Sequence, residues 1–302
     1  KESIFTGLNN LKVLSITDER YDEYFGFTDT EVREMLKYYE IEDHYEEVKN
    51  WYDGYQFGSV ELYCPWDVLN YCDKLKDHGD SFPENYWINT SSNGAVRKFI
   101  QMSGNLKTKR EIETLLAGEE IIKEIHQELV YPEMYQSLEN VWSLLFMTGY
   151  LTQRGRVDAK RYKLAIPNLE IRDIFQTQIM ESFKEKVKKD GTTLSQFCEA
   201  LRNGEEKKVE DIFTGYLKKT ISIRDTFVRK ASKENFYHGI LLGILGVKEE
   251  WYVSSNQESG EGYSDIMVET ENSETVILIE VKYANDGNLD RTCERALQQI
   301  EE

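Results

Sequence analysis

Residues 275–282, Thr-Val-Ile-Leu-Ile-Glu-Val-Lys, decide how the C-terminal part of the chain is interpreted. A continuous apolar run rich in β-branched residues is typical of a central strand buried on both faces. The run ends in Glu280 and Lys282, which are two positions apart and therefore share one side of a strand. Burying charges is costly unless they pair or bind a metal ion, so these two residues are candidates for a special role.

A second strand, predicted at residues 263–269, carries Asp265, and a polar turn at 271–273 would fold it onto the first. This hairpin would place Asp265 beside Glu280. Two carboxylates on adjacent strands suit Mg²⁺ or Mn²⁺, and a nearby lysine can act on water or on the charge that develops on phosphate. The same pattern also fits a structural Glu280–Lys282 ion pair with Asp265 in a loop, and spacing alone does not separate the two interpretations.

The overall charge opposes nucleic-acid binding, because 55 acidic and 37 basic residues give a net charge of −18. Phosphate neutralisation drives most such binding, so a nucleic-acid site requires metal ions or a local basic patch. Residues 217–233 supply a basic segment with Asp225 as its one acidic residue. It could follow a phosphate backbone or serve as a solvated linker.

Other features of the sequence indicate a reduced, cytoplasmic, globular protein. Hydrophobic residues make up 40% of the chain, enough for substantial cores. The cysteines lack the spacing of a zinc site or a disulfide framework, and no apolar run is long enough to predict a membrane span. The four cysteines are Cys64, Cys72, Cys198 and Cys293.

Local signals predict an α+β protein with a mostly helical first part. Thr28 and Glu31 form a capping-box pattern before a helix, and Pro65 suits the first turn of another. We expect further helices at residues 43–53, 95–102, 107–117, 119–130 and 138–147. A hairpin of 149–152 and 162–166 would follow, which gives a winged-helix-like arrangement or an unrelated α+β lid. Helices over 168–218 should break at 190–191 and 203–204, and we expect the main domain boundary near 190–204.

The last 70 residues change character. A helix at 234–245 precedes strands at 251–253, 263–269 and 275–283, and a charged helix spans 288–302. This order predicts a compact α/β unit.

This C-terminal part resembles the PD-(D/E)XK nuclease domain of a bacterial family in which an AAA-like ATPase precedes that domain. The matching stretches are Glu234–Gly239, Gly262–Asp265, Ile279–Lys282 and Ala296–Ile300. The resemblance implies a small restriction-endonuclease-like fold. It also implies that Asp265, Glu280, Glu234 and the carbonyl of Val281 bind metal, that Lys282 is the catalytic lysine, and that Gln299 is an accessory catalytic residue.

The first two-thirds resembles the ATPase part of the same family. The matching stretches are Ser3–Asn10, Tyr24–Thr28, Trp51–Tyr55, Tyr63–Trp66, Tyr86–Asn93 and Ile166–Glu170. No Gly-x-x-x-x-Gly-Lys-Ser/Thr segment is present to hold phosphates. We therefore expect residues 1–28 to end an AAA-like core, 29–190 to form a helical lid, and 204–302 to form a nuclease-like domain that continues beyond this chain. ATP would bind only through a segment that precedes the chain.

The sequence therefore predicts a Mg²⁺- or Mn²⁺-dependent nuclease, with DNA favoured over RNA as the substrate and no membrane association. An oligomer is compatible with this prediction. One alternative is an inactive nuclease-like module that binds protein or nucleic acid as the partner of an ATPase. Another is a regulatory nucleotide-binding protein whose chemistry resides in a preceding segment. Convergence of Asp265, Glu280 and Lys282 around an open cavity would favour the enzyme.

Overall fold

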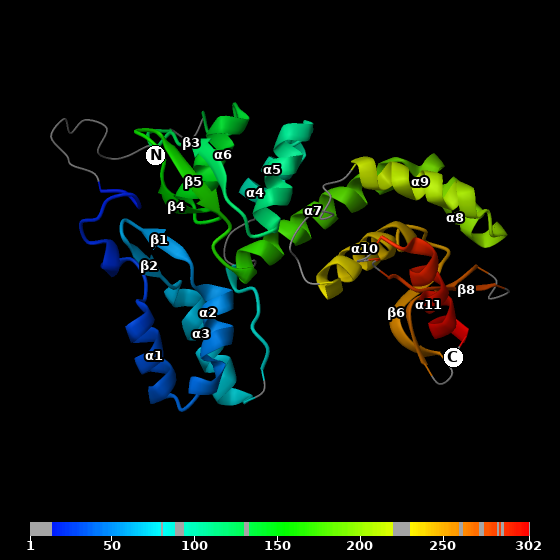
Figure 1. Ribbon diagram of the computed structural model, residues 1–302, viewed down its shortest axis with the longest axis horizontal. Coiled ribbons are helices and arrows are strands. Elements are labelled where there is room, and N and C mark those ends of the chain that lie inside the picture. The colour runs from blue at the N-terminus through cyan, green and yellow to red at the C-terminus, as the bar shows by residue number, and fades with distance from the viewer. Residues whose placement is uncertain are drawn as a thin grey trace. The chain divides into compact units, whose positions relative to one another are not determined.

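The computed structural model describes residues 14–79, 81–87, 94–129, 133–219, 230–259, 262–271, 275–282, 284 and 287–301. The chain divides into two compact units, Lys1–Gln178 and Ile179–Glu302. The division falls inside one long helix, upstream of the segment 190–204 at which the sequence predicted a boundary. Figure 1 shows the helices and strands of both units.

The first unit combines helices with two small antiparallel sheets. Its helices are η1 (Asp22–Tyr24), α1 (Asp29–Tyr38), η2 (Glu42–His44), α2 (Tyr45–Tyr52), α3 (Pro65–Asp77), α4 (Gly94–Met102), α5 (Leu106–Leu116), α6 (Leu138–Met147) and the first part of α7 (Leu169–Lys189). Its strands are β1 (Tyr55–Phe57), β2 (Val60–Leu62), β3 (Ile121–Glu124), β4 (Thr152–Arg156) and β5 (Arg161–Ala165). The strand orders are β1-β2 and β3-β5-β4.

Local capping chemistry sets several helix ends as predicted. The Thr28 side chain accepts a hydrogen bond from the Glu31 amide, and the Glu31 carboxylate accepts one from the Thr28 amide, which completes the capping box of α1. Pro65 begins α3. The predicted breaks are also confirmed, because α8 (Gly191–Asn203) and α9 (Glu206–Lys219) follow α7, and Gly204 adopts the left-handed conformation between them.

The helix predicted at 119–130 is wrong. Gly118 has a positive φ of 85° and ends α5, and residues Ile121–Glu124 then form β3, antiparallel to β5. The neighbouring β-branched Ile121 and Ile122 favour a strand once β5 supplies hydrogen-bonding partners. The β4–β5 hairpin is confirmed, whereas the short β1–β2 hairpin was not predicted.

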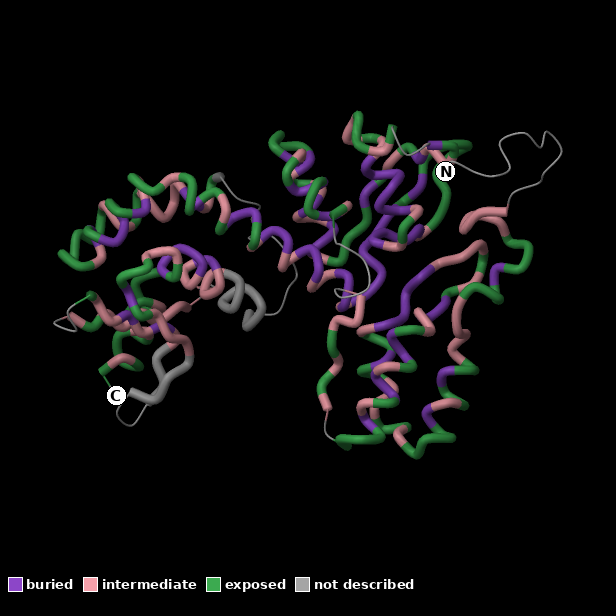
Figure 2. The backbone as a smooth tube through the Cα atoms, turned by 180° about the vertical axis from the view of Figure 1, so that it is seen from behind, coloured by how far each residue is buried: buried purple, intermediate pink, exposed green. Residues whose placement is uncertain are grey.

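Buried side chains of the first unit gather in two places. One core lies among α1, α2 and α3, around Tyr52, Tyr63 and Tyr71. The other lies along α6, β5 and the first part of α7, where Figure 2 shows many buried residues. Trp142 and Phe175 are fully buried there. Of the predicted ATPase remnant at 1–28, residues 1–13 lie outside the described part of the chain.

The second unit contains the predicted α/β arrangement. After α8 and α9 come α10 (Lys230–Leu245), β6 (Tyr252–Ser259), β7 (Gly262–Glu269), β8 (Val276–Ile279) and α11 (Leu289–Glu301). The three strands form an antiparallel sheet in the order β6-β7-β8. Ile266 and Val268 of β7 are fully buried, as are Ile244 and Leu245 of α10. The α+β class predicted from the sequence is therefore confirmed.

One expectation about this sheet is wrong. The apolar run of 275–282 predicted a central strand buried on both faces, but within the described residues β8 pairs only with β7. Val276 is 53% exposed and Ile277–Ile279 are half-buried. A run of branched apolar residues indicates a propensity for extended structure. It does not indicate how many neighbouring strands are present.

Candidate active site at the end of the sheet

Asp265 and Glu280 are neighbours across β7 and β8. The two strands pair with Ile266 opposite Ile279, so the next step of the antiparallel register places Asp265 opposite Glu280. Two hydrogen bonds connect the two strands beyond their last backbone pair. The Val281 amide donates to Asp265 Oδ2 at 2.8 Å, and the Asp265 amide contacts Glu280 Oε2 at 3.4 Å. The hairpin predicted from the sequence thus places Asp265 and Glu280 side by side.

Lys282 joins this pair through Glu280. Its ammonium nitrogen Nζ donates to Glu280 Oε1 in an ion pair. The Glu280 side chain is only 1% exposed, whereas that of Lys282 is 27% exposed. The Glu280 carboxyl group is therefore buried beside a partly accessible cation.

The donor chemistry of this cluster fits a hard divalent cation. Asp265 Oδ2 is occupied by the Val281 amide, while Oδ1 accepts no hydrogen bond from any residue that the structure describes. Carboxylate oxygens are the preferred ligands of Mg²⁺ and Mn²⁺. However, in the described ranges no group of three or more His, Cys, Asp or Glu side chains is placed to hold a metal ion. A complete site therefore needs a ligand beyond Asp265 and Glu280, such as a carbonyl, a water molecule or another carboxylate.

The accessory residues are placed less fully. Glu234 belongs to α10, but its side chain lies outside the described part of the structure. Gln299 is exposed on α11 and makes no hydrogen bond to Asp265, Glu280 or Lys282 in the described residues. Val281 directly follows Glu280, and its amide already contacts Asp265.

His238 also contacts this site. Its Nε2 atom lies 2.8 Å from the carbonyl oxygen of Asp265 and 3.2 Å from Ser255 Oγ. His238 lies four residues after Glu234 and therefore on the same face of α10. Its backbone partner depends on how α10 packs on the sheet, which helical spacing does not indicate.

A second carboxyl pair, in the first unit, was not anticipated. Asp67 of α3 and Glu170 of α7 are fully buried and lie within hydrogen-bonding reach of each other. Burial and the neighbouring Asp67 raise the pKa of Glu170 to about 9, and burial also raises the pKa of Asp67. Glu170 Oε1 accepts the Trp87 amide at 2.9 Å. A proton on Oε2 could then be donated to Asp67, a carboxyl group that also lies within hydrogen-bonding reach of the Cys64 thiol.

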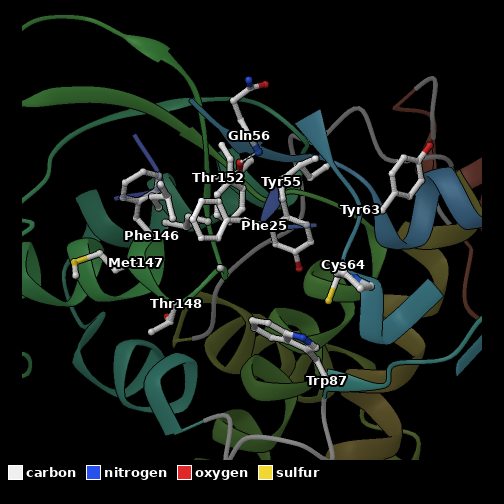
Figure 3. Close-up of a pocket in the computed structure, with 16 residues that line it drawn as sticks. Phe25, Tyr55, Gln56, Tyr63, Cys64, Trp87, Phe146, Met147, Thr148 and Thr152 are labelled. Atoms are coloured by element: carbon white, nitrogen blue, oxygen red, sulfur yellow. Dashed lines mark hydrogen bonds between the residues drawn. The ribbon is translucent and has the colours of Figure 1, made fainter. Parts of the chain in front are cut away.

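The first unit also contains a cavity of about 270 Å³, shown in Figure 3. Aromatic side chains, including Phe25, Tyr55, Trp87 and Phe146, surround it, and none of its lining residues is charged. None of the site residues predicted from the sequence lines it. It therefore lacks the cationic groups with which proteins usually contact phosphate.

Two further expectations concern the basic segment and membrane-spanning helices. Most of the basic segment, at 220–229, lies outside the described residues, and Lys218 is exposed near the end of α9. Among the helices that the structure describes, none has both the length and the apolar character required to cross a bilayer.

Comparisons with known proteins support the site at the level of a superfamily. Residues 232–302 match a family model described as the PD-(D/E)XK nuclease superfamily, and this segment contains every site residue predicted from the sequence. A 180-residue part of the chain is 29% identical to a protein from Azotobacter chroococcum mcd 1 described as "Uncharacterized protein in vnfD 5'region". That match covers 57% of this chain but only 30% of the relative. No solved structure matches the chain.

Proposed function

We propose that the second unit is a metal-dependent nuclease that hydrolyses phosphodiester bonds of DNA, with Asp265, Glu280 and Lys282 at its active site. The observation that carries the proposal is the direct pairing of Asp265 with Glu280, with Lys282 bonded to Glu280, inside a segment that matches a nuclease superfamily. The carboxylates, the lysine and the superfamily match all suit phosphodiester hydrolysis.

Each residue has a distinct role in this proposal. Asp265 and Glu280 would hold Mg²⁺ or Mn²⁺, together with the Val281 carbonyl and, directly or through water, Glu234. When bound, such an ion activates water and polarises the phosphoryl oxygen. Lys282 would hold the attacking water or stabilise negative charge on the phosphate as the new P–O bond forms and the old one breaks. Gln299 would assist from α11.

The remaining parts of the proposal concern the protein as a whole. The first unit would be the lid region of an AAA-like ATPase, and ATP binding by that ATPase would regulate the nuclease. The basic residues of 217–233 would contact the DNA backbone without base preference. We place the protein in the bacterial cytoplasm.

A second candidate function is favoured by the burial of Glu280. A carboxylate with a 1% exposed side chain that pairs with a lysine is also what a structural ion pair looks like. In that case the second unit would be an inactive nuclease-like module that binds protein or nucleic acid beside an ATPase.

Replacement of Lys282 separates these two functions. Lys282→Ala leaves the Glu280 carboxylate buried without its cation, which we expect to destabilise the second unit by about 3–5 kcal/mol in the absence of metal. In the enzyme, saturating Mn²⁺ restores stability because the ion takes over the neutralising charge. Turnover of supercoiled plasmid nevertheless falls by roughly two or more powers of ten. Lys282→Arg restores little turnover, because a planar guanidinium differs in geometry from an ammonium.

Lys248 provides the matched control, since its side chain is 25% exposed and pairs with Glu250 at 2.8 Å in the same unit. Lys248→Ala should leave both plasmid nicking and the response to Mn²⁺ unchanged. Melting curves with and without Mn²⁺, recorded beside the nicking assay, give the result. A Lys282→Ala protein that Mn²⁺ fails to stabilise would favour the inactive module, and one that nicks DNA normally would remove Lys282 from the mechanism.

A further inference from the structure

Side chains contact the backbone of Asp265 where the regular pairing of β7 with β8 stops, while β7 continues beside β6, with Ser255 opposite Ile266 and Gln257 opposite Ser264. The last backbone pair of these strands is Ile266 with Ile279. Polar backbone groups at a partly buried position need partners, and both the amide and the carbonyl of Asp265 contact side chains. Its amide contacts Glu280 Oε2, and its carbonyl oxygen contacts His238 Nε2 at 2.8 Å.

The contact with His238 defines the state of the histidine ring. A carbonyl oxygen can only accept a hydrogen bond, so Nε2 must carry the proton and donate it. Ser255 Oγ lies 3.2 Å from the same nitrogen and can share that N–H as a second acceptor. The ring therefore links α10 to Ser255 of β6 and to Asp265 of β7.

The helix that carries His238 is held close to α7 by two glycines. A Cβ atom at Gly239 would lie 3.3 Å from Met180 Cε, and one at Gly243 would lie 3.2 Å from Lys184 Cε. Because residues four apart share one helix face, both glycines face α7. His238, about 100° around the helix, is then free to face the sheet.

We propose that His238 is a positioning residue for the candidate active site: by donating to the Asp265 carbonyl it fixes the direction of the Asp265 carboxylate. The catalytic consequence rests on the proposed nuclease function. The backbone amide of Asp265 is already used by Glu280, and Oδ2 is used by the Val281 amide. With the carbonyl held by His238, little freedom remains for Oδ1, the oxygen left for a metal ion.

Two replacements of His238 test this role. Glutamine places an amide N–H about as far from the backbone as Nε2, whereas asparagine is too short to reach the same acceptor. We expect His238→Asn to lower kcat for plasmid nicking by roughly 10–100-fold, with KM for DNA unchanged, as is usual when a partner of a metal ligand is lost. His238→Gln should retain most of the activity. Ser255→Ala is the control. The Ser255 side chain contacts the same nitrogen, and among the described residues it makes no hydrogen bond to Asp265.

A measurement that does not depend on activity distinguishes this proposal from the nuclease proposal. The Val281 amide is bonded to Asp265 Oδ2, so its hydrogen exchange, followed by NMR, reports the placement of the carboxylate. Exchange should become several-fold faster in His238→Asn and stay near the wild-type rate in His238→Gln and Ser255→Ala. If Val281 behaves in this way while the wild-type chain nicks no DNA, His238 still positions Asp265 and the nuclease proposal alone fails. Unchanged exchange in His238→Asn, or equal impairment in the two His238 variants, would overturn the positioning role.

Discussion

Asp67 with Glu170 in the first unit and Asp265 with Glu280 in the second are both pairs of adjacent carboxyl groups, but their surroundings differ. The first pair is completely buried, and the raised pKa values of both groups favour a shared proton. In the second pair, Glu280 is bonded to Lys282, whose side chain is 27% exposed, and Asp265 keeps one oxygen without a hydrogen bond in the described structure.

The difference shows what makes a pair of acids suitable for chemistry. Asp67 and Glu170 are fully buried, and holding a proton lowers the electrostatic cost of placing two carboxyl groups together. The raised pKa of Glu170, about 9, means that this proton is kept at neutral pH, so the pair forms a structural link between α3 and α7. In the second pair the Lys282 ammonium supplies the positive charge beside Glu280, and under the proposed function this pair would hold a metal ion. Number and proximity of carboxylates are therefore poorer guides to a metal site than the cation beside them and the access of solvent.

The largest expected effect is a pH dependence of stability that arises from the buried pair of Asp67 and Glu170. Glu170 is protonated up to a pH of about 9 in the folded chain, whereas an unfolded glutamate ionises near 4.5. Between these values the folded state binds a proton that the unfolded state has lost. The contribution of Glu170 to the free energy of unfolding of the first unit should therefore be greatest below pH 4.5. It should fall as pH rises towards 9, by at most about 1.4 kcal/mol per pH unit.

Glu170→Gln tests this expectation, because the amide resembles a protonated carboxyl group and cannot ionise. We expect it to flatten the pH dependence and to raise stability at pH 9, as read from hydrogen exchange of peptides in α3 and in residues 169–178. Glu119→Gln, an exposed acid in the same unit, is the control and should keep the wild-type pH dependence. A wild-type unit that is equally stable at pH 5 and pH 9 would show that the pair does not share a proton.

A smaller effect is expected for the second pair, and it comes from metal. If Asp265 and Glu280 bind Mn²⁺, the ion should stabilise the second unit by about 2.7 kcal/mol at a concentration 100 times its Kd. Asp265→Asn keeps an oxygen for the Val281 amide, so we expect stability without metal to be equal or higher and the Mn²⁺ effect to vanish. Calorimetric melting provides the measurement.

The control for this experiment is Asp290→Asn, the same change at an exposed position of α11. It should retain the full Mn²⁺ effect. If Asp265→Asn also retains it, Asp265 is not a ligand and the contrast between the two carboxyl pairs loses its basis.

The sequence was informative where structure depends on nearby residues. The Thr28 cap, Pro65 at the start of α3 and the Gly204 helix end follow from local backbone chemistry. The Asp265–Glu280 contact follows from a hairpin with a short polar turn.

Features that depend on residues far apart in the sequence could not be predicted from local sequence patterns. Ile121 and Ile122 form a strand because β5 lies beside them, and no local pattern provides that partner. Asp67 and Glu170 meet only after α3 and α7 pack. His238 finds a backbone carbonyl, which carries no signature in the sequence.

The central claim is that Asp265, Glu280 and Lys282 form a metal-dependent nuclease site, and a metal titration of plasmid nicking tests it most directly. Supercoiled plasmid would be incubated with the 302-residue chain over a range of Mg²⁺ and Mn²⁺ concentrations, beside Asp265→Ala and the Asp290→Asn control. We predict nicking that rises with metal and saturates for the wild type and the control, and a loss of roughly two or more powers of ten for a folded Asp265→Ala protein. Nicking by Asp265→Ala at the wild-type rate, or no nicking by the wild type at any metal concentration, would contradict the claim.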